Sequence, residues 1–292
     1  MAGSHHVLVL GGHGKIAQML TPLLLKRSWT VTSVIRTQEQ APTIEKLGAG
    51  LPGKLNVLVR SIADVDSDAR ARSILDEVKP DYVAWSAGAG GKGGDAMVTI
   101  PLSRARTRKH TLTHPDYPSP HLHSTYKIDR DAAIHFINAA AASSFVKRFL
   151  LVSYSGSRRA GASWWPAGEW DKYNSTVNHG FLAAYYQAKL AADEALYEAS
   201  RRSGGKMIGL CLRPGTLSMD PAGRIEFGKT ARLNGQVSRE SVAQTADALL
   251  AADGVKNSWL DLLDGDQEVE AAVTKAVRDG IDTSEGEAIH SS

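Results

Sequence analysis

The stretch VLVLGGHGKIA, from Val7 to Ala17, sets the architecture to expect of the whole chain. A short aliphatic run breaks into three glycines within four positions, and a helical pattern follows at once. Glycines between a buried strand and a helix let backbone N–H groups approach a phosphate at the positive end of that helix. A plain tight turn is the alternative. Strand, glycines and amphipathic helix occur in the order that a pyrophosphate site requires, so the stretch predicts dinucleotide binding.

Beyond this stretch the chain alternates short apolar runs with amphipathic helical patterns. Apolar strands separated by helices form a parallel sheet covered on both faces, so the pattern predicts an α/β, doubly wound, Rossmann-type fold. We expect one NAD(P)-binding domain over 1–280, with a small C-terminal part beside the substrate cleft, and a flexible tail over 281–292. The expected strands are 6–10, 30–35, 55–59, 81–86, 148–153, 207–213 and 259–263, and the expected helices are 15–27, 68–78, 129–142, 183–202, 240–252 and 267–277.

Composition excludes several classes of protein. The 292 residues contain no apolar run of the roughly 18 residues that a membrane span needs. Cys211 is the only cysteine, which excludes an internal disulfide and fits the reducing cytoplasm. The excess of basic residues, which gives a net charge of +3, is concentrated in 101–124, and the rest of the chain is nearly neutral. We therefore expect a cytoplasmic protein with a small-molecule substrate, no nucleic-acid partner, no membrane partner and an undetermined oligomeric state.

One segment, 97–125, does not fit the alternating pattern. It is rich in proline, histidine and arginine and has no apolar period, so we interpret it as an exposed, disordered insertion. The alternative is a zinc site built from His110, His114, His121 and His123. The segment offers no carboxylate cluster beside these histidines, so no metal is expected.

The end of the second expected strand indicates which dinucleotide binds. NAD-specific proteins carry an acidic residue there, which accepts hydrogen bonds from the ribose hydroxyls. Here Ile35 is followed by Arg36, Thr37 and Gln38. A guanidinium can hold a 2′-phosphate through paired, charge-assisted hydrogen bonds. The sequence therefore favours NADP over NAD, and the alternative is an ordinary surface arginine.

Topology extends the predicted cofactor site along the sheet edge. Ser61 and Ile62 follow the third strand, where the adenine would rest, and Ala87 and Gly88 end the fourth strand, beneath the nicotinamide. The predicted cofactor contacts are Gly11, Gly12, His13, Gly14, Lys15, Ile16, Arg36, Ser61, Ile62, Ala87, Gly88, Lys189 and Pro214.

Tyr185 and Lys189 are four residues apart and therefore lie on one face of a helix. A phenol with a pKa near 10 is a poor acid or base at neutral pH, and a neighbouring cation favours the phenolate. A serine hydroxyl at the adjoining strand end, from Ser153 or Ser155, can hold the substrate oxygen while a hydride arrives. The predicted catalytic residues are Tyr185, Lys189 and either serine. The alternative is a packing tyrosine beside a solvated lysine.

Three motifs together resemble the short-chain dehydrogenase/reductase superfamily: GGHGKIA at 11–17, YYQAK at 185–189 and LRPGTLS at 212–218. They are most similar to its atypical, NmrA-like or epimerase-like branch. The resemblance implies a Rossmann fold, a dinucleotide at Gly11–Ala17 and a Ser, Tyr, Lys site at Ser153 or Ser155, Tyr185 and Lys189. It also implies that catalysis can be lost while the fold and the cofactor are kept. The serine motif here reads VSYS, and the usual acidic residue after the third strand is replaced around Ser61.

The segment 157–178 separates the serine strand from the tyrosine helix and carries the aromatics Trp164, Trp165 and Trp170. Loops at this sheet edge form substrate clefts, so the tryptophans are predicted to contact an apolar substrate. Alternatively, they seal the loop onto the core.

Three functions follow from these patterns. The first is an NADP-dependent oxidoreductase acting on an unidentified carbonyl or alcohol. The second is a non-catalytic, redox-sensing NAD(P)-binding protein, and the third is an NAD(P)-dependent epimerase.

Overall fold

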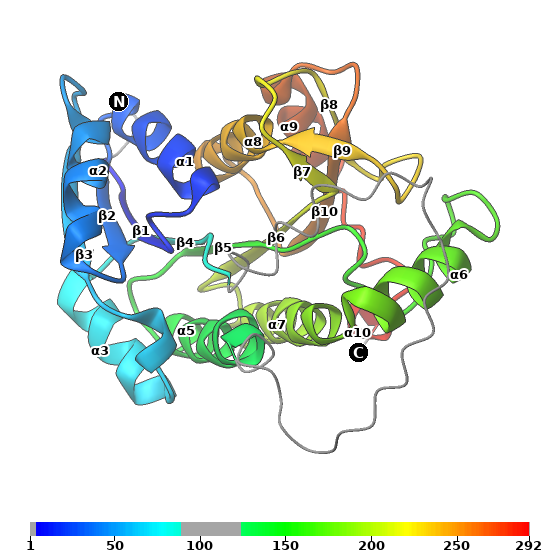
Figure 1. Cartoon of the computed structure of the whole chain (residues 1–292), viewed down its shortest axis with the longest axis horizontal. Helices are drawn as coiled ribbons and strands as arrows, with labels where there is room; N and C mark the ends of the chain where they lie inside the picture. Colours follow the sequence, from blue (N-terminus) through cyan, green and yellow to red (C-terminus); the bar gives the residue numbers. More distant parts are fainter. Residues whose placement is uncertain (1–3, 89–123, 292) are drawn as a thin grey trace, which may run out of the picture.

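The computed structural model describes residues 4–88 and 124–291 and has a doubly wound α/β architecture (Figure 1). Its main sheet has eight strands in the order β3-β2-β1-β4-β5-β6-β10-β8. Neighbouring strands are parallel, except that β8 runs antiparallel to β10. The order reverses beside β1, because the chain first builds outward through β2 and β3 and then returns to β4 on the other side. Ligands bind at such switch points in α/β sheets.

The strands have these bounds: β1 His6–Leu10, β2 Thr30–Ile35, β3 Lys54–Val59, β4 Tyr82–Trp85, β5 Arg148–Val152, β6 Ile208–Pro214, β8 Ile225–Gly228 and β10 Ser258–Asp264. A separate parallel pair joins β7 (Thr216–Ser218) to β9 (Gln236–Ser238). The alternation of side chains along β1 shows why the sheet is buried on both sides. Val7 and Val9 pack into one core cluster, and Leu8 and Leu10 pack into the other.

Two helical layers cover the sheet (Figure 1). One face carries α1 (Lys15–Lys26), α8 (Arg239–Ala251) and α9 (Val269–Arg278), and the other carries α3 (Asp68–Val78), α5 (Ala133–Ala141) and α7 (Ala183–Arg202). The shorter helices are α2 (Ala41–Glu45), α6 (Glu169–Tyr173) and α10 (Ala288–Ser291), with 3₁₀ turns at Gln38–Gln40, Lys46–Gly48 and Ile62–Asp64.

Two π-helices lie next to α7: η5 (Tyr126–Ala132), which packs against it, and η6 (Asn174–Phe181), which precedes it. The helical path of η6 breaks at Gly180, whose φ of −102° and ψ of −115° are not helical. π-helical turns concentrate at functional sites because they displace side chains from the regular helical ladder. The position of the two π-helices therefore indicates a candidate functional region at the N-terminal half of α7.

The Rossmann-type fold predicted from the sequence is confirmed, with two local differences. The edge strand β8 is antiparallel, and the segment 157–178, expected to be a loop, contains α6 and part of η6. The predicted insertion at 97–125 lies outside the described residues, apart from Ser124 and Thr125.

The C-terminal segment also differs from the flexible tail expected over 281–292. Its described residues pack against the body of the protein, and Thr283 and Ser284 are fully buried. Thr283 donates its backbone N–H to the carbonyl of Trp259 at 2.8 Å. This packing was not predictable from the sequence, because the segment is short, polar and without periodicity.

Candidate functional site

The glycine loop after β1 leaves no room for side chains. Gly11 has a φ of +84°, and a Cβ there would lie 2.6 Å from the Cα of Ala87. A Cβ on Gly12 would overlap the hydroxyl of Ser33 on β2. Glycine is required at these positions because the loop runs directly over the ends of β2 and β4.

The loop leads directly into helix α1, and the N-terminus of this helix can bind an anion. Gly14 is the N-cap residue; it supplies no side-chain cap, and the first turn contains no acidic residue. The N–H groups at the start of a helix lack partners within the helix, and the dipole favours negative charge there. Lys15 is exposed in this first turn, and Ala17 is fully buried where the helix meets the sheet. The cradle therefore fits the pyrophosphate of a dinucleotide.

Arg36 and Arg60 lie at the ends of neighbouring strands, because Ile35 of β2 is paired with Val59 of β3. The backbone N–H of Arg36 is held by the Gln40 side chain at 3.0 Å, and its own side chain is exposed. Arg60 is also exposed and lies 3.6 Å from Glu77. Sequence reasoning passed over Arg60, although it directly precedes Ser61. The strand edge carries two guanidinium groups where the adenosine end of a dinucleotide would lie.

The other predicted cofactor residues lie along the same sheet edge. Ala87 contacts the Gly11 loop just after β4, and Ser61 begins the 3₁₀ turn after β3. Pro214 ends β6, and its carbonyl accepts the backbone N–H of Ser155 at 3.0 Å. All of these positions follow the carboxyl ends of parallel strands.

Tyr185, Lys189 and Asp193 recur every four residues on α7 and form one stripe along the helix. Lys189 is 1% exposed, and its ammonium donates to the carbonyl of Val152, the last residue of β5, at 2.7 Å. Asp193 is fully buried one turn further on. The stripe joins α7 to the carboxyl end of β5, where the predicted serine site begins.

The two candidate serines make different contacts. Ser153 donates its hydroxyl to the Asp193 carboxylate at 2.7 Å, so it lies against α7. The Ser155 hydroxyl faces the Leu233 carbonyl at 3.4 Å, in the loop before β9. Both serines are buried, and only Ser153 is joined to the helix that carries Tyr185 and Lys189.

Tyr185 lies against a second phenol, with its ring 5.2 Å from that of Tyr154. The Tyr154 hydroxyl donates to Asn178, and Asn178 in turn donates to the carbonyl of Gly156. Burial raises the pKa of Tyr185 above its ordinary value, and Asp129 and Asp193 add to this effect. The expected lowering by Lys189 is therefore not found. In this environment Tyr185 is a neutral phenol and a weaker acid than a solvent-exposed one.

Asp193 is the functional candidate that sequence reasoning missed. Burial raises the pKa of its carboxyl, although the cations of Arg213 and Lys189 act against that rise. One carboxylate oxygen accepts from Ser153, and the other is buried without a hydrogen bond of good geometry. The signal was present in the sequence, since Asp193 continues the four-residue spacing of Tyr185 and Lys189.

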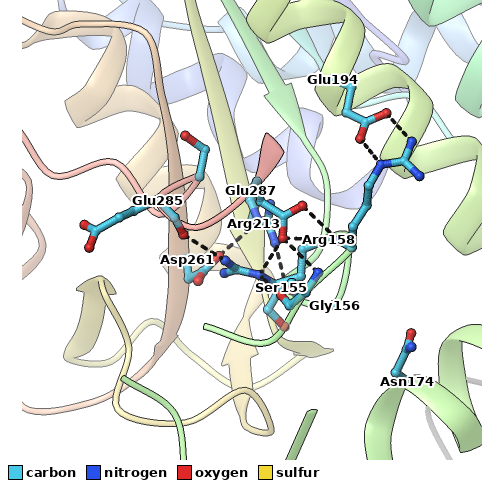
Figure 2. A network of polar contacts seen from close by, with 12 residues as sticks. Ser155, Gly156, Arg158, Asn174, Glu194, Arg213, Asp261, Glu285 and Glu287 are labelled. Atoms are coloured by element: carbon cyan, nitrogen blue, oxygen red, sulfur yellow. Dashed lines mark hydrogen bonds and ion pairs between the residues drawn. The ribbon is translucent and has the colours of Figure 1, made fainter. Parts of the chain in front are cut away.

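Figure 2 shows a buried ionic network that contains Arg158, Arg213, Asp261 and Glu287. Arg213 pairs with Asp261 at 3.0 Å, and both side chains are fully buried. Arg158 pairs with Glu287 of the C-terminal segment at 3.3 Å, and each of these side chains is 1% exposed. Glu287 also accepts the backbone N–H of Ala160 at 3.0 Å. The network thus ties the loop after β5 to β6, β10 and the end of the chain.

The three predicted substrate tryptophans gather on one side of that loop. Trp164, Trp165 and Trp170 form an aromatic cluster with Ala162 and Leu233. Trp165 is 7% exposed, and its indole donates to the carbonyl of Thr230 at 3.1 Å. The Arg158 guanidinium lies 4.9 Å from its ring. These contacts favour the sealing role that the sequence left open for Trp165.

Within residues 4–88 and 124–291, no cluster of three or more His, Cys, Asp or Glu side chains could hold a metal ion. The histidines of the alternative zinc site, His110, His114, His121 and His123, lie outside the described residues. In the same described ranges, no helix is both long and apolar enough to cross a membrane.

Several known proteins are similar to this chain over most of its length. A UPF0659 protein of Schizosaccharomyces pombe is 27% identical over 94% of this chain and 95% of its own length. An uncharacterized sugar epimerase of Bacillus subtilis, YhfK, is 24% identical over 92% of this chain and 99% of its own. The crystal structure of the oxidoreductase ylbE from Lactococcus lactis superposes with a TM-score of 0.62, covering 94% of this chain and 97% of its own at 18% identity.

A protein-family model also matches most of the chain. The sequence model of the NAD(P)H-binding family matches residues 11–253, which run from the glycine loop past α8. The matched region therefore contains the cradle at the start of α1 and the Tyr185, Lys189 stripe. This chain belongs to the NAD(P)H-binding family, and its ligand is a nicotinamide dinucleotide.

Proposed function

We propose that this protein is an NADP(H)-dependent oxidoreductase that reduces a small carbonyl compound. The observation that carries the proposal is the anchoring of Lys189 to the carboxyl end of β5, one helical turn from Tyr185. This arrangement sets a neutral phenol and a buried cation on one helix face at the sheet edge where the dinucleotide cradle lies.

In this proposal each residue has a chemical role. The bound dinucleotide supplies a hydride to the carbonyl carbon. Tyr185 gives its phenolic proton to the carbonyl oxygen, so the substrate becomes an alcohol and the phenol becomes a phenolate. Lys189 holds α7 against the carboxyl end of β5 and so sets the position of Tyr185. Ser153 holds the substrate oxygen; of the two serines, only Ser153 is hydrogen-bonded to α7.

We also propose that NADP is preferred over NAD. The Arg36 side chain is exposed directly after β2, at the position where NAD-specific proteins carry an acidic residue. Arg60 adds a second guanidinium at the next strand end. Paired, charge-assisted hydrogen bonds from such groups discriminate strongly between a phosphate and a hydroxyl.

The catalytic proposal is tested by turnover. Purified protein would be mixed with NADPH and a panel of aldehydes, ketones and quinones while the loss of NADPH absorbance is followed. Tyr185→Phe should lower the rate by about a hundredfold or more, as expected for the loss of a general acid. Tyr186→Phe is the matched control, because it removes a neighbouring phenol that donates to the Arg158 carbonyl instead. Equal rates in Tyr185→Phe and the wild type would refute the assignment.

A second function, a non-catalytic dinucleotide sensor, is favoured by one observation. The hydroxyls of Ser153 and Ser155 both face acceptors within the protein, so neither is free to hold a substrate in this arrangement. Tight NADPH binding with no turnover across the panel, together with a partner protein that binds only the NADP or only the NADPH form, would support the sensor. The third hypothesis, an NAD(P)-dependent epimerase, is supported by the similarity to the B. subtilis sugar epimerase. It predicts a dinucleotide that is retained through purification.

A further inference from the structure

The hydroxyl of Ser153 has one proton, and its oxygen donates to the Asp193 carboxylate across an O···O distance of 2.7 Å. A serine that donates to a carboxylate offers only lone pairs to anything else nearby. A carbonyl substrate has no proton to give to those lone pairs. Ser153 as seen here can therefore accept a hydrogen bond from an alcohol but cannot donate one to a carbonyl.

The direction of this hydrogen bond depends on the protonation of Asp193. A protonated carboxyl is itself a hydrogen-bond donor. It can donate a hydrogen bond to the Ser153 oxygen, and the serine hydroxyl can then point elsewhere. The second carboxylate oxygen is buried and has no hydrogen bond of good geometry. An ionised carboxylate ordinarily has both oxygens solvated or bonded, so this site solvates the charge poorly.

Cationic, hydroxyl and thiol groups from several elements surround Asp193. From α7 come Lys189 and Tyr185, from β5 and the loop after it come Ser153, Tyr154 and Ser157, and from β6 come Cys211 and Arg213. Two of these groups, Lys189 and Arg213, are cations that favour the carboxylate. Burial opposes them and prevails, so the pKa of Asp193 lies above its ordinary value.

We propose that Asp193 is a positioning residue that sets whether Ser153 donates a hydrogen bond to the substrate oxygen or accepts one from it. With Asp193 protonated, Ser153 donates to a carbonyl oxygen and reduction proceeds. With Asp193 ionised, Ser153 turns its proton inward and accepts from an alcohol. The only bond that changes is the O–H bond of the Asp193 carboxyl, which breaks when the proton passes to solvent water and re-forms when it returns, while the serine hydroxyl rotates. The inference rests on the proposed function, because it assumes that Ser153 faces the substrate oxygen.

The first test does not require turnover. Infrared spectra of the full chain, recorded as a function of pH, should show the C=O band of a protonated carboxyl that is absent in Asp193→Asn. Ser153→Ala should shift that band, because it removes the hydrogen-bond partner, and Ser155→Ala should leave it in place, because Ser155 faces Leu233 instead. No Asp193 band at any pH above the ordinary aspartate range, or a band that Ser153→Ala does not move, would overturn the proposal.

The second test compares pH profiles of NADPH-dependent reduction of a substrate from the carbonyl panel. The wild-type rate should fall as the pH rises through the pKa of Asp193. Asp193→Asn should lose that fall, because its amide donates to Ser153 at every pH, and Asp193→Ala should be slower by about a hundredfold, the scale of a lost oxyanion donor. Identical profiles for the wild type and Asp193→Asn would refute the switch. If no carbonyl is reduced, the proposed function fails, and the infrared test still decides whether Ser153 and Asp193 are coupled.

Discussion

Lys189 donates its ammonium to the carbonyl of Val152 at 2.7 Å, which joins helix α7 to the last residue of strand β5. This contact sets the position of Tyr185 on the preceding helical turn and of Asp193 on the following turn. A long, flexible side chain loses rotamer entropy when it is fixed in the interior, and a buried ammonium must replace its lost water. The arrangement is best explained by a need for positive charge at this strand end.

The glycine loop predicts that alanine substitution lowers dinucleotide affinity at one glycine and not at another glycine with a similar φ angle. Gly11→Ala and Gly50→Ala both place a methyl group at positive φ, +84° and +73°. Gly50→Ala should lose about 1 kcal/mol of unfolding free energy, and Gly11→Ala should lose more because its methyl also clashes. Only the Gly11 methyl meets the Ala87 backbone, whereas the space around Gly50 is open. Calorimetry should show NADPH affinity falling at least about tenfold in Gly11→Ala alone. Wild-type affinity in Gly11→Ala would contradict the cradle.

The buried ion pair between Glu287 of the C-terminal segment and Arg158 predicts a large loss of stability when the pair is broken. Glu287→Gln leaves the buried Arg158 guanidinium without its carboxylate and should lower the unfolding free energy by about 3 kcal/mol, measured by urea denaturation. Glu285→Gln is the matched control, because its pair with Lys229 is largely exposed. It should leave the urea midpoint almost unchanged. Equal midpoints for the two variants would mean that the segment contributes little to the fold.

The raised pKa of Asp193 predicts how stability depends on pH. A carboxyl whose pKa is higher in the folded protein stabilises the fold fully below its ordinary pKa, and this contribution is lost as the pH rises through the folded pKa. Asp193→Asn removes this loss. The difference in unfolding free energy between Asp193→Asn and the wild type should therefore grow in favour of the variant as the pH rises through that window. A difference independent of pH would contradict the raised pKa.

Several elements were predictable from the sequence because their periodicity is local. The residues His6–Leu10, Thr30–Ile35, Asp68–Val78 and Ala183–Arg202 form the elements expected of them, with the same bounds. Strands β7 and β9 were missed because three residues are too few for an alternating pattern to show. The π-helix η6 has no sequence period that distinguishes it from a loop.

The site was predictable in part, for a related reason. The glycine loop and the spacing of Tyr185 and Lys189 are local signals. Ser153 and Ser155 both lie beyond the end of β5, and what distinguishes them is contact with Asp193, 40 positions away, or with Leu233, 78 positions away. The pairing of Arg158 with Glu287 joins residues 129 positions apart, so no local pattern could reveal it.

Calorimetric titration with NADPH and NADH, on the wild type and on Arg36→Ala, tests the central claim most directly. Arg70→Ala serves as the control, because Arg70 pairs with Asp66 next to α3. The account predicts that the wild type binds NADPH tighter than NADH by roughly tenfold or more and that Arg36→Ala removes this preference. Arg70→Ala should keep it. Equal binding of the two nucleotides by the wild type, or a preference that survives in Arg36→Ala, would contradict NADP recognition by Arg36.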